Sequence, residues 1–154
     1  MLASAEHLWR VNQDYVNRLA KARNYLDLLE QLVLERSTVE TQDQLLPTLE
    51  FTRAHLTGLS DEQHDWCYRY FYESPATKRI VQSPNAIRRA LASFGEMCER
   101  HRSYFGDLAS LLTSLPRPKS TVTRVPNGDL WEMVAFALND LIDFSSNLNV
   151  AELA

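Results

Sequence analysis

The sequence has 154 residues and is poor in the residues that make turns and crosslinks, with four glycines, six prolines and two cysteines. So few glycines and prolines argue against an all-β protein, which needs turn residues between many short strands. No two glycines lie within six residues of each other, which excludes a glycine-rich phosphate-binding loop. No apolar run reaches the roughly 18 residues of a membrane-spanning helix. A helical globular protein is the class that remains.

The N-terminus lacks the basic start and the apolar core of a signal peptide. The spacing of Cys67 and Cys98 does not call for a disulfide, so we read both as reduced thiols. Together these observations predict a cytoplasmic protein.

The strongest pattern in the sequence is an apolar series in the second half of the chain. Its nine members recur at alternating steps of four and three residues: Ile87, Leu91, Phe94, Cys98, His101, Phe105, Leu108, Leu112 and Leu115. Such steps place all nine side chains on one face of a helix. Pro84 suits the first helical position, and Pro116 ends the pattern. The series therefore predicts one helix over about 84–115.

A second series of the same kind predicts a first helix over about 4–36, and its inner face consists of Leu8, Val11, Tyr15, Leu19, Ala22, Leu26, Leu29 and Val33. Between the two long helices, proline, glycine and serine signals predict shorter pieces over about 46–58, from Ser60 to Ser74 and over 75–81. Residues 116–128 form a loop in which no partner strand is evident, and a last helix follows over about 129–148.

These elements predict an all-α fold, in which residues 1–154 form one elongated bundle domain of about five or six helices. Helices 4–36 and 84–115 are its spine. One chain of this size has few residues with which to cover the apolar faces of both long helices and of the last helix. We therefore expect a homodimer.

Charge is unevenly distributed along the chain. Residues 69–124 carry ten basic and four acidic side chains, whereas 125–154 carry five acidic and no basic ones. The candidate anion-binding or nucleic-acid-binding residues are Lys78, Arg79, Arg88, Arg89, Arg100 and Arg102. A helix-turn-helix arrangement in 74–94 would suit DNA, but the helix that follows is too long for a recognition helix. The alternatives are a basic middle segment packed between acidic neighbours and a surface for an acidic protein.

Five aromatic side chains crowd into the segment 66–72. The candidate partner-binding residues there are Trp66, Tyr68, Arg69, Tyr70 and Tyr72, because tyrosine, tryptophan and arginine dominate interface hot spots. Seven residues cover nearly two helical turns, so one core cannot bury every ring. The alternatives are two layers of one core with the hydroxyls at its rim, and base stacking on single-stranded nucleic acid.

Motifs of catalysis are absent. The paired Glu-x-x-His motifs of di-iron bundles do not occur, nor does the nucleophile turn of a serine hydrolase. Cys98 and His101 share a helix face at i and i+3, but two ligands do not close a metal site. We therefore predict no catalytic residue, metal site or cofactor, and retain a metal- or thiol-dependent activity at this pair only as a weaker alternative.

The sequence thus favours a small non-enzymatic binding or regulatory protein, an adaptor that acts through a helical surface rich in aromatic residues and arginine. A nucleic-acid-binding subunit that uses the basic segment 69–124 is the alternative. A membrane partner is not expected.

Overall fold

The structure, a computed structural model, describes residues 5–72, 84–116, 124–125 and 128–148. Their four α-helices are α1 (Ala5–Arg36), α2 (Val39–Cys67), α3 (Pro84–Ser114) and α5 (Leu130–Asn147). A π-helical turn, η1 (Tyr68–Tyr72), extends α2, and two-residue strands β1 (Arg124–Val125) and β2 (Gly128–Asp129) precede α5. The all-α prediction is confirmed.

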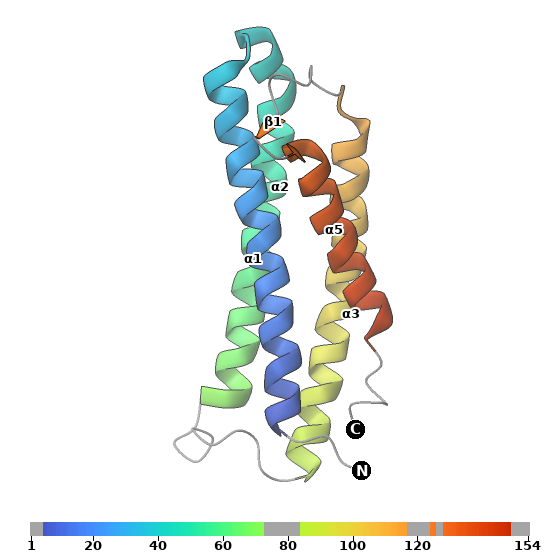
Figure 1. Ribbon diagram of the computed structural model, residues 1–154. Helices are drawn as coiled ribbons and strands as arrows, with labels where there is room; N and C mark the ends of the chain where they lie inside the picture. The colour runs from blue at the N-terminus through green and yellow to red at the C-terminus, as the bar shows by residue number, and fades with distance from the viewer. Residues whose placement is uncertain (1–4, 73–83, 117–123, 126–127, 149–154) are drawn as a thin grey trace.

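The helices run alternately up and down and form an elongated antiparallel bundle (Figure 1). Helix α1 packs against α2 and α5, while α3 packs against α5 and, over a smaller area, against α2. Helix α5 therefore lies across the bundle from α2, and the α1–α5 and α2–α3 pairs form opposite sides of the molecule.

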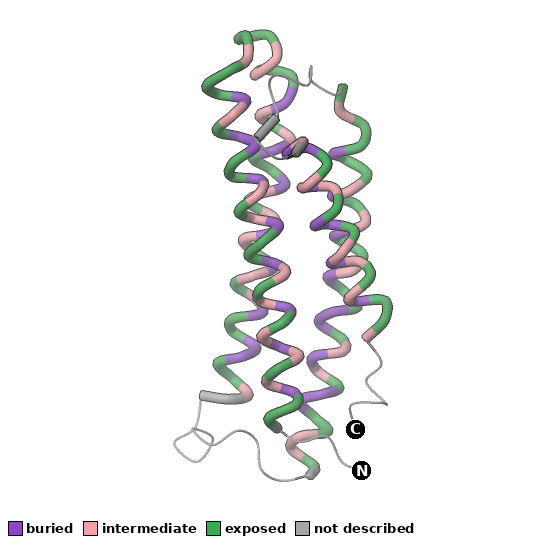
Figure 2. Tube along the Cα trace, viewed as in Figure 1, coloured by how far each residue is buried: buried purple, intermediate pink, exposed green. Residues whose placement is uncertain are grey.

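Both long apolar series face the interior, as predicted (Figure 2). Tyr15, Phe94 and Phe105 are fully buried and are the largest such side chains. Val11 in the first series, and Ile87 and Leu115 at the two ends of the second, remain half-buried. Burial of these stripes stabilises the bundle by about 1.5–3 kcal/mol for each large side chain.

Side chains cap two of the helices. The Thr38 hydroxyl accepts a hydrogen bond from the Thr41 amide at 3.2 Å at the start of α2. The Asp129 carboxylate accepts one from the Trp131 amide at 2.9 Å at the start of α5. Both bonds satisfy backbone donors that have no partner within the helix.

The predicted number of helices, five to six, is wrong for the described residues. Helix α2 continues through Pro47, where a helix was predicted to begin, and through Gly58, where it was predicted to end; no described glycine has a positive φ. A buried stripe runs the full length of α2, so tertiary packing outweighs the local stop signals. It comprises Leu45, Leu49, Thr52, Leu56, Leu59, Gln63, Trp66 and Cys67. The predicted piece over 75–81 lies outside the described residues.

The segment before α5 also differs from the prediction. Val125 pairs with Gly128, and Arg124 pairs with Asp129, in an antiparallel ladder that the sequence did not indicate. Among the described residues, no helix is long and apolar enough to cross a membrane.

Candidate functional site

The structure divides the aromatic segment 66–72 between core and surface. Trp66 is only 7% exposed, and its indole N–H donates to the Ser93 hydroxyl at 3.1 Å. Its ring centroid lies 5.1 Å from those of Phe94 and Tyr70, so Trp66 closes one end of the core. Trp66 is therefore mainly a core residue, and its predicted contact with a partner stays a prediction.

Tyr68 and Arg69 are the exposed members of the segment, whereas Tyr70 is half-buried against Trp66. Tyr72 lies in η1, and the structure does not describe its side chain. Among the side chains of 66–70, which the structure describes, Tyr68 and Arg69 are therefore the two that are exposed to a partner.

The predicted basic patch is also divided. Lys78 and Arg79 lie outside the described residues. Arg88 and Arg102 are 14 residues apart on α3, and Arg89 and Arg100 are 11 apart, so at 100° per residue each pair shares a face. The centres of the two faces are about 130° apart around the axis of α3. Arg100 also forms an ion pair with Glu62 at 2.6 Å, so the arginines do not form one anion-binding surface.

Cys98 and His101 lie in the core, where His101 connects three helices. The Tyr15 hydroxyl of α1 lies 2.6 Å from His101 Nδ1, and Glu62 Oε2 of α2 lies 3.0 Å from His101 Nε2. Among the described residues, no group of three or more His, Cys, Asp or Glu side chains is arranged to hold a metal ion.

Burial sets the protonation of this cluster. It lowers the pKa of His101, and this effect outweighs the opposing one of Glu62, so the imidazole is neutral at pH 7. Burial raises the pKa of Glu62, but hydrogen bonds from His101 and Arg100 outweigh it and leave the pKa below its ordinary value. An ionised carboxylate only accepts, so His101 Nε2 carries the proton and Nδ1 accepts from Tyr15.

The remaining titratable groups of the cluster are held neutral. Burial raises the pKa of the Cys98 thiol to about 12 and raises the pKa of Tyr15 above its ordinary value. A neutral buried thiol is a poor nucleophile. None of the surface cavities of about 260, 350 and 390 Å³ is lined by Tyr15, Cys98 or His101. The arrangement is suited to holding three helices in register rather than to chemistry on a substrate.

A second polar contact joins α1 and α2 near the same level. Gln63 donates through its side-chain amide to Asn12 Oδ1 at 2.5 Å, and Asn12 donates to Cys67 Sγ at 3.4 Å. All three side chains are buried out of reach of water, so these hydrogen bonds give their polar groups the partners that they need.

One cavity lies between α1 and α5, and we call it the α1–α5 groove. It has a volume of about 390 Å³ and is lined by Lys21, Tyr25, Asp129, Glu132, Met133 and Phe136. Phe136 is 68% exposed, and the Lys21 ammonium lies 5.9 Å from the centre of the Tyr25 ring. A groove with an apolar floor and charged rim is a surface that can receive another side chain.

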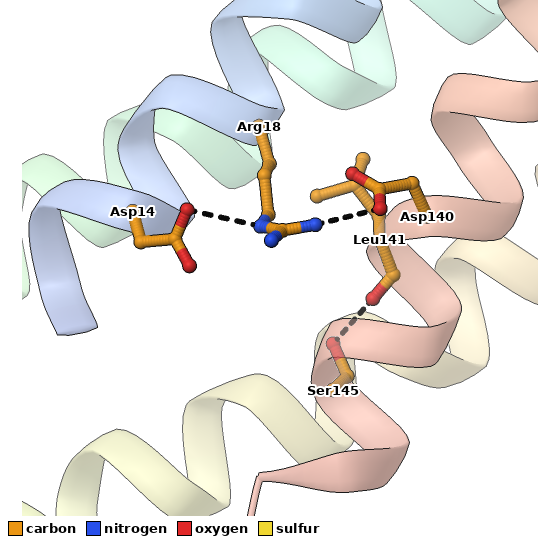
Figure 3. A network of polar contacts seen from close by, with 5 residues as sticks. All are labelled: Asp14, Arg18, Asp140, Leu141 and Ser145. Carbon is orange, nitrogen blue, oxygen red and sulfur yellow. Dashed lines mark hydrogen bonds and ion pairs between the residues drawn. The ribbon is translucent and has the colours of Figure 1, made fainter.

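Arg18 ties the two walls of this groove together one turn from Lys21 (Figure 3). It bonds to Asp14 at 3.1 Å on α1 and to Asp140 at 2.6 Å on α5. Its guanidinium carbon lies 5.3 Å from the centre of the Phe144 ring. Arg18 therefore joins α1 to α5 through an ion pair and a contact with an aromatic ring.

Exposed rings also occur on the opposite side of the bundle. Phe51 and His55 of α2 have ring centroids 5.8 Å apart, and His55 lies 4.9 Å from Tyr104 of α3. Phe51 is 54% exposed and Tyr104 39%.

Sequence reasoning missed the groove residues Tyr25, Met133 and Phe136. The signal was present for one of them, because Phe136 falls outside the buried stripe of α5, which contains Val134, Ala137 and Leu141. A large aromatic residue away from a helix's buried stripe indicates an exposed ring. The pairing of α5 with α1, which the sequence does not determine, was needed to place it beside Tyr25.

Comparison with known proteins yields no match: no protein-family model fits the chain, and no curated protein or solved structure is significantly similar to it. Function is therefore argued from the geometry alone.

Proposed function

We propose that the protein is a non-enzymatic binding module that receives a basic amphipathic helix in the α1–α5 groove. The observation that carries the proposal is the exposure of Phe136 beside Tyr25 and Met133, on two adjacent helices. Groups of rings and methionine at a helix–helix groove are the usual receptors for an apolar helix face.

The shape of the groove favours a helix as the ligand. Two antiparallel helices leave a groove between their ridges, and the side chains of a third helix fit it at ordinary helix-packing distances. Met133 and Phe136 are three residues apart on α5 and form one ridge of that groove.

Charge favours a basic ligand. Helix α5 carries Glu132, Asp140 and Asp143 and no basic residue, and Asp129 directly precedes it. Arg18 neutralises part of the charge of Asp140. A helix that carries acidic residues and no basic one favours the approach of a cationic ligand over an acidic one.

The interior supports a binding role over catalysis. Tyr15, His101 and Glu62 are hydrogen-bonded to one another, and the Cys98 thiol is neutral. Because these groups satisfy one another, no activated nucleophile or base remains in the described cluster.

A labelled model peptide tests the proposal. We expect an amphipathic helix of leucine and lysine to bind by fluorescence anisotropy, and its leucine–glutamate counterpart not to bind. Phe136→Ala should weaken binding about tenfold or more, because it removes the central apolar anchor. Phe51→Ala is the matched control, since it removes a ring of similar exposure from the opposite side of the bundle. Equal affinities for wild type and Phe136→Ala would refute the groove as the binding site.

A further inference from the structure

The exposed side of α2 has a pattern that the binding proposal does not use. We call it the outer α2 face, and it consists of Glu40, Gln44, Pro47, Phe51, Ala54, Gly58, Asp65 and Arg69. All eight residues are exposed and recur at helical steps of three, four and seven, with Arg69 lying just beyond α2 in η1. They form one stripe about 43 Å long that points away from the core.

Six of the eight residues pair about the midpoint of the stripe: Glu40 with Arg69, Gln44 with Asp65, and Phe51 with Gly58. Phe51 and Gly58 are equidistant from the point between Ala54 and His55, and so are Glu40 and Arg69. A two-fold axis through that point, perpendicular to the helix, would place Phe51 of one copy over Gly58 of the other. It would also place Glu40 opposite Arg69. Contacts that are exchanged in this way define an isologous interface.

Gly58 provides space for the ring of the second copy. A Cβ built at Gly58 would have no other atom within 4 Å, so the helix surface there is open. Phe51 lies two turns away on the same face and is 54% exposed. A bare glycine backbone allows close approach of a neighbouring chain, and a phenylalanine ring fills the space that it leaves.

Charge is complementary in the same arrangement. Glu40 of each copy meets Arg69 of the other, and Asp65 meets Gln44, so no like charges are opposed. Within the described part of the chain, neither Glu40 nor Arg69 takes part in an ion pair. Both side chains are exposed, so the pairs would give specificity and orientation more than affinity.

We propose that the outer α2 face binds a second copy of this chain in an antiparallel, two-fold symmetric dimer. An unrelated partner would not require apolar and charged positions that mirror one another about a single point. Because α5 lies across the bundle from α2, the dimer leaves both α1–α5 grooves open and facing outward. The inference is independent of what the groove binds.

The first test compares two identical substitutions at glycines. We expect the wild-type chain to be dimeric in analytical ultracentrifugation at micromolar concentration. Gly58→Gln should raise the dissociation constant at least about tenfold, because its side chain occupies the place of the Phe51 ring. Gly106→Gln is the matched control, since Gly106 also has no atom within 4 Å of an added Cβ but lies on the side of α3 away from α2. Circular dichroism should show undiminished helix in both variants.

The second test exchanges charges. Glu40→Arg and Arg69→Glu should each raise the dissociation constant about tenfold, because a dimer contains two copies of the altered pair. The double variant Glu40→Arg/Arg69→Glu should recover the wild-type value. The two positions lie about 43 Å apart within one chain, so recovery can come only from contact between chains.

Three results would overturn the proposal: a wild-type chain that is monomeric at 100 µM and above, a dimer that is equally stable with Gly58→Gln and Gly106→Gln, or charge variants that do not compensate. Each result would mean that the outer α2 face is exposed to solvent or binds a different protein. The peptide experiment at the α1–α5 groove would be unaffected.

Discussion

At the scale of single residues, the most informative group is the chain of hydrogen bonds from Tyr15 through His101 to Glu62. It crosses from α1 through α3 to α2, and Arg100 ends it at the surface. A buried polar group without a partner destabilises the fold, so only one register of the three helices satisfies all of them. The cluster therefore specifies the arrangement of the bundle.

Tyr15→Phe tests this role with the loss of one oxygen. The ring would keep its contacts with Phe94, Phe105 and Phe144, but His101 Nδ1 would lose its donor. We expect the free energy of unfolding to fall by about 1–3 kcal/mol, the usual effect of leaving a buried acceptor without a partner. Urea denaturation measures it. Tyr25→Phe, at a half-buried position, is the control, and equal losses in the two variants would contradict the proposed role.

At the scale of elements, α2 shows how packing overrides local signals. Pro47 lies inside the helix, lacks an amide hydrogen and leaves the carbonyl of Asp43 without its helical partner. Both Pro47 and Gly58 are exposed, so the free energy that each costs the helix is confined to its own turn. The buried stripe on the other side of α2 is uninterrupted. The helix therefore forms in spite of them.

The loss of folding stability that Pro47 causes can be measured. Pro47→Ala should raise the free energy of unfolding by about 1–3 kcal/mol, because it restores a backbone hydrogen bond and removes a steric clash. Chemical denaturation of the two proteins provides the comparison. Gln44→Ala, one turn earlier on the same exposed face, should change stability by only a few tenths of a kcal/mol. If Pro47→Ala does not raise the free energy of unfolding, α2 accommodates the proline without strain.

At the scale of the whole molecule, the two proposed binding surfaces lie on opposite sides of the bundle. The α1–α5 side has a negative helix and an apolar groove, and the α2–α3 side has exposed rings with charged ends. Because the core separates the two surfaces, the proposed dimer would leave the proposed helix-binding groove accessible. A dimer built on the outer α2 face would be bivalent, which strengthens attachment to a ligand that presents two helices.

The stability of the whole molecule should fall in mild acid because of His101. Burial holds the pKa of His101 below its ordinary value of 6.5, so below that pH the unfolded chain binds a proton that the folded chain does not. The free energy of unfolding should therefore decrease as the pH falls from 6.5 towards the pKa of the folded state. Below pH 4.5, loss of the Glu62 carboxylate adds to this decrease, because the pKa of Glu62 is lowered in the folded state.

Urea denaturation between pH 7.5 and 5 checks this prediction. His101→Gln should show a shallower dependence on pH, since glutamine does not titrate. His7, His55 and His64 remain in both proteins, so the difference between the two curves isolates His101. Identical curves would show that His101 does not govern acid stability.

The candidate site was less predictable than the fold. Helices α1, α3 and α5 agree with their predicted ranges to within about two residues, because each has one apolar stripe at helical spacing. The partner surface was placed at 66–72, where Trp66 is buried and Tyr68 is exposed, whereas the exposed rings of Phe136 and Phe51 lie elsewhere. Composition marks aromatic residues but does not indicate which of them lack a neighbouring helix to cover them.

The sequence by itself determined that the chain forms long helices and which stripe of each is buried, since these follow from the spacing of apolar residues along a single element. The tertiary structure decided which helices are neighbours. That arrangement places Tyr25 beside Phe136, joins Tyr15 to His101 and leaves the outer face of α2 uncovered. The physical reason is that a surface or a buried hydrogen bond belongs to two elements at once, and no periodicity within one helix specifies the partner of that helix.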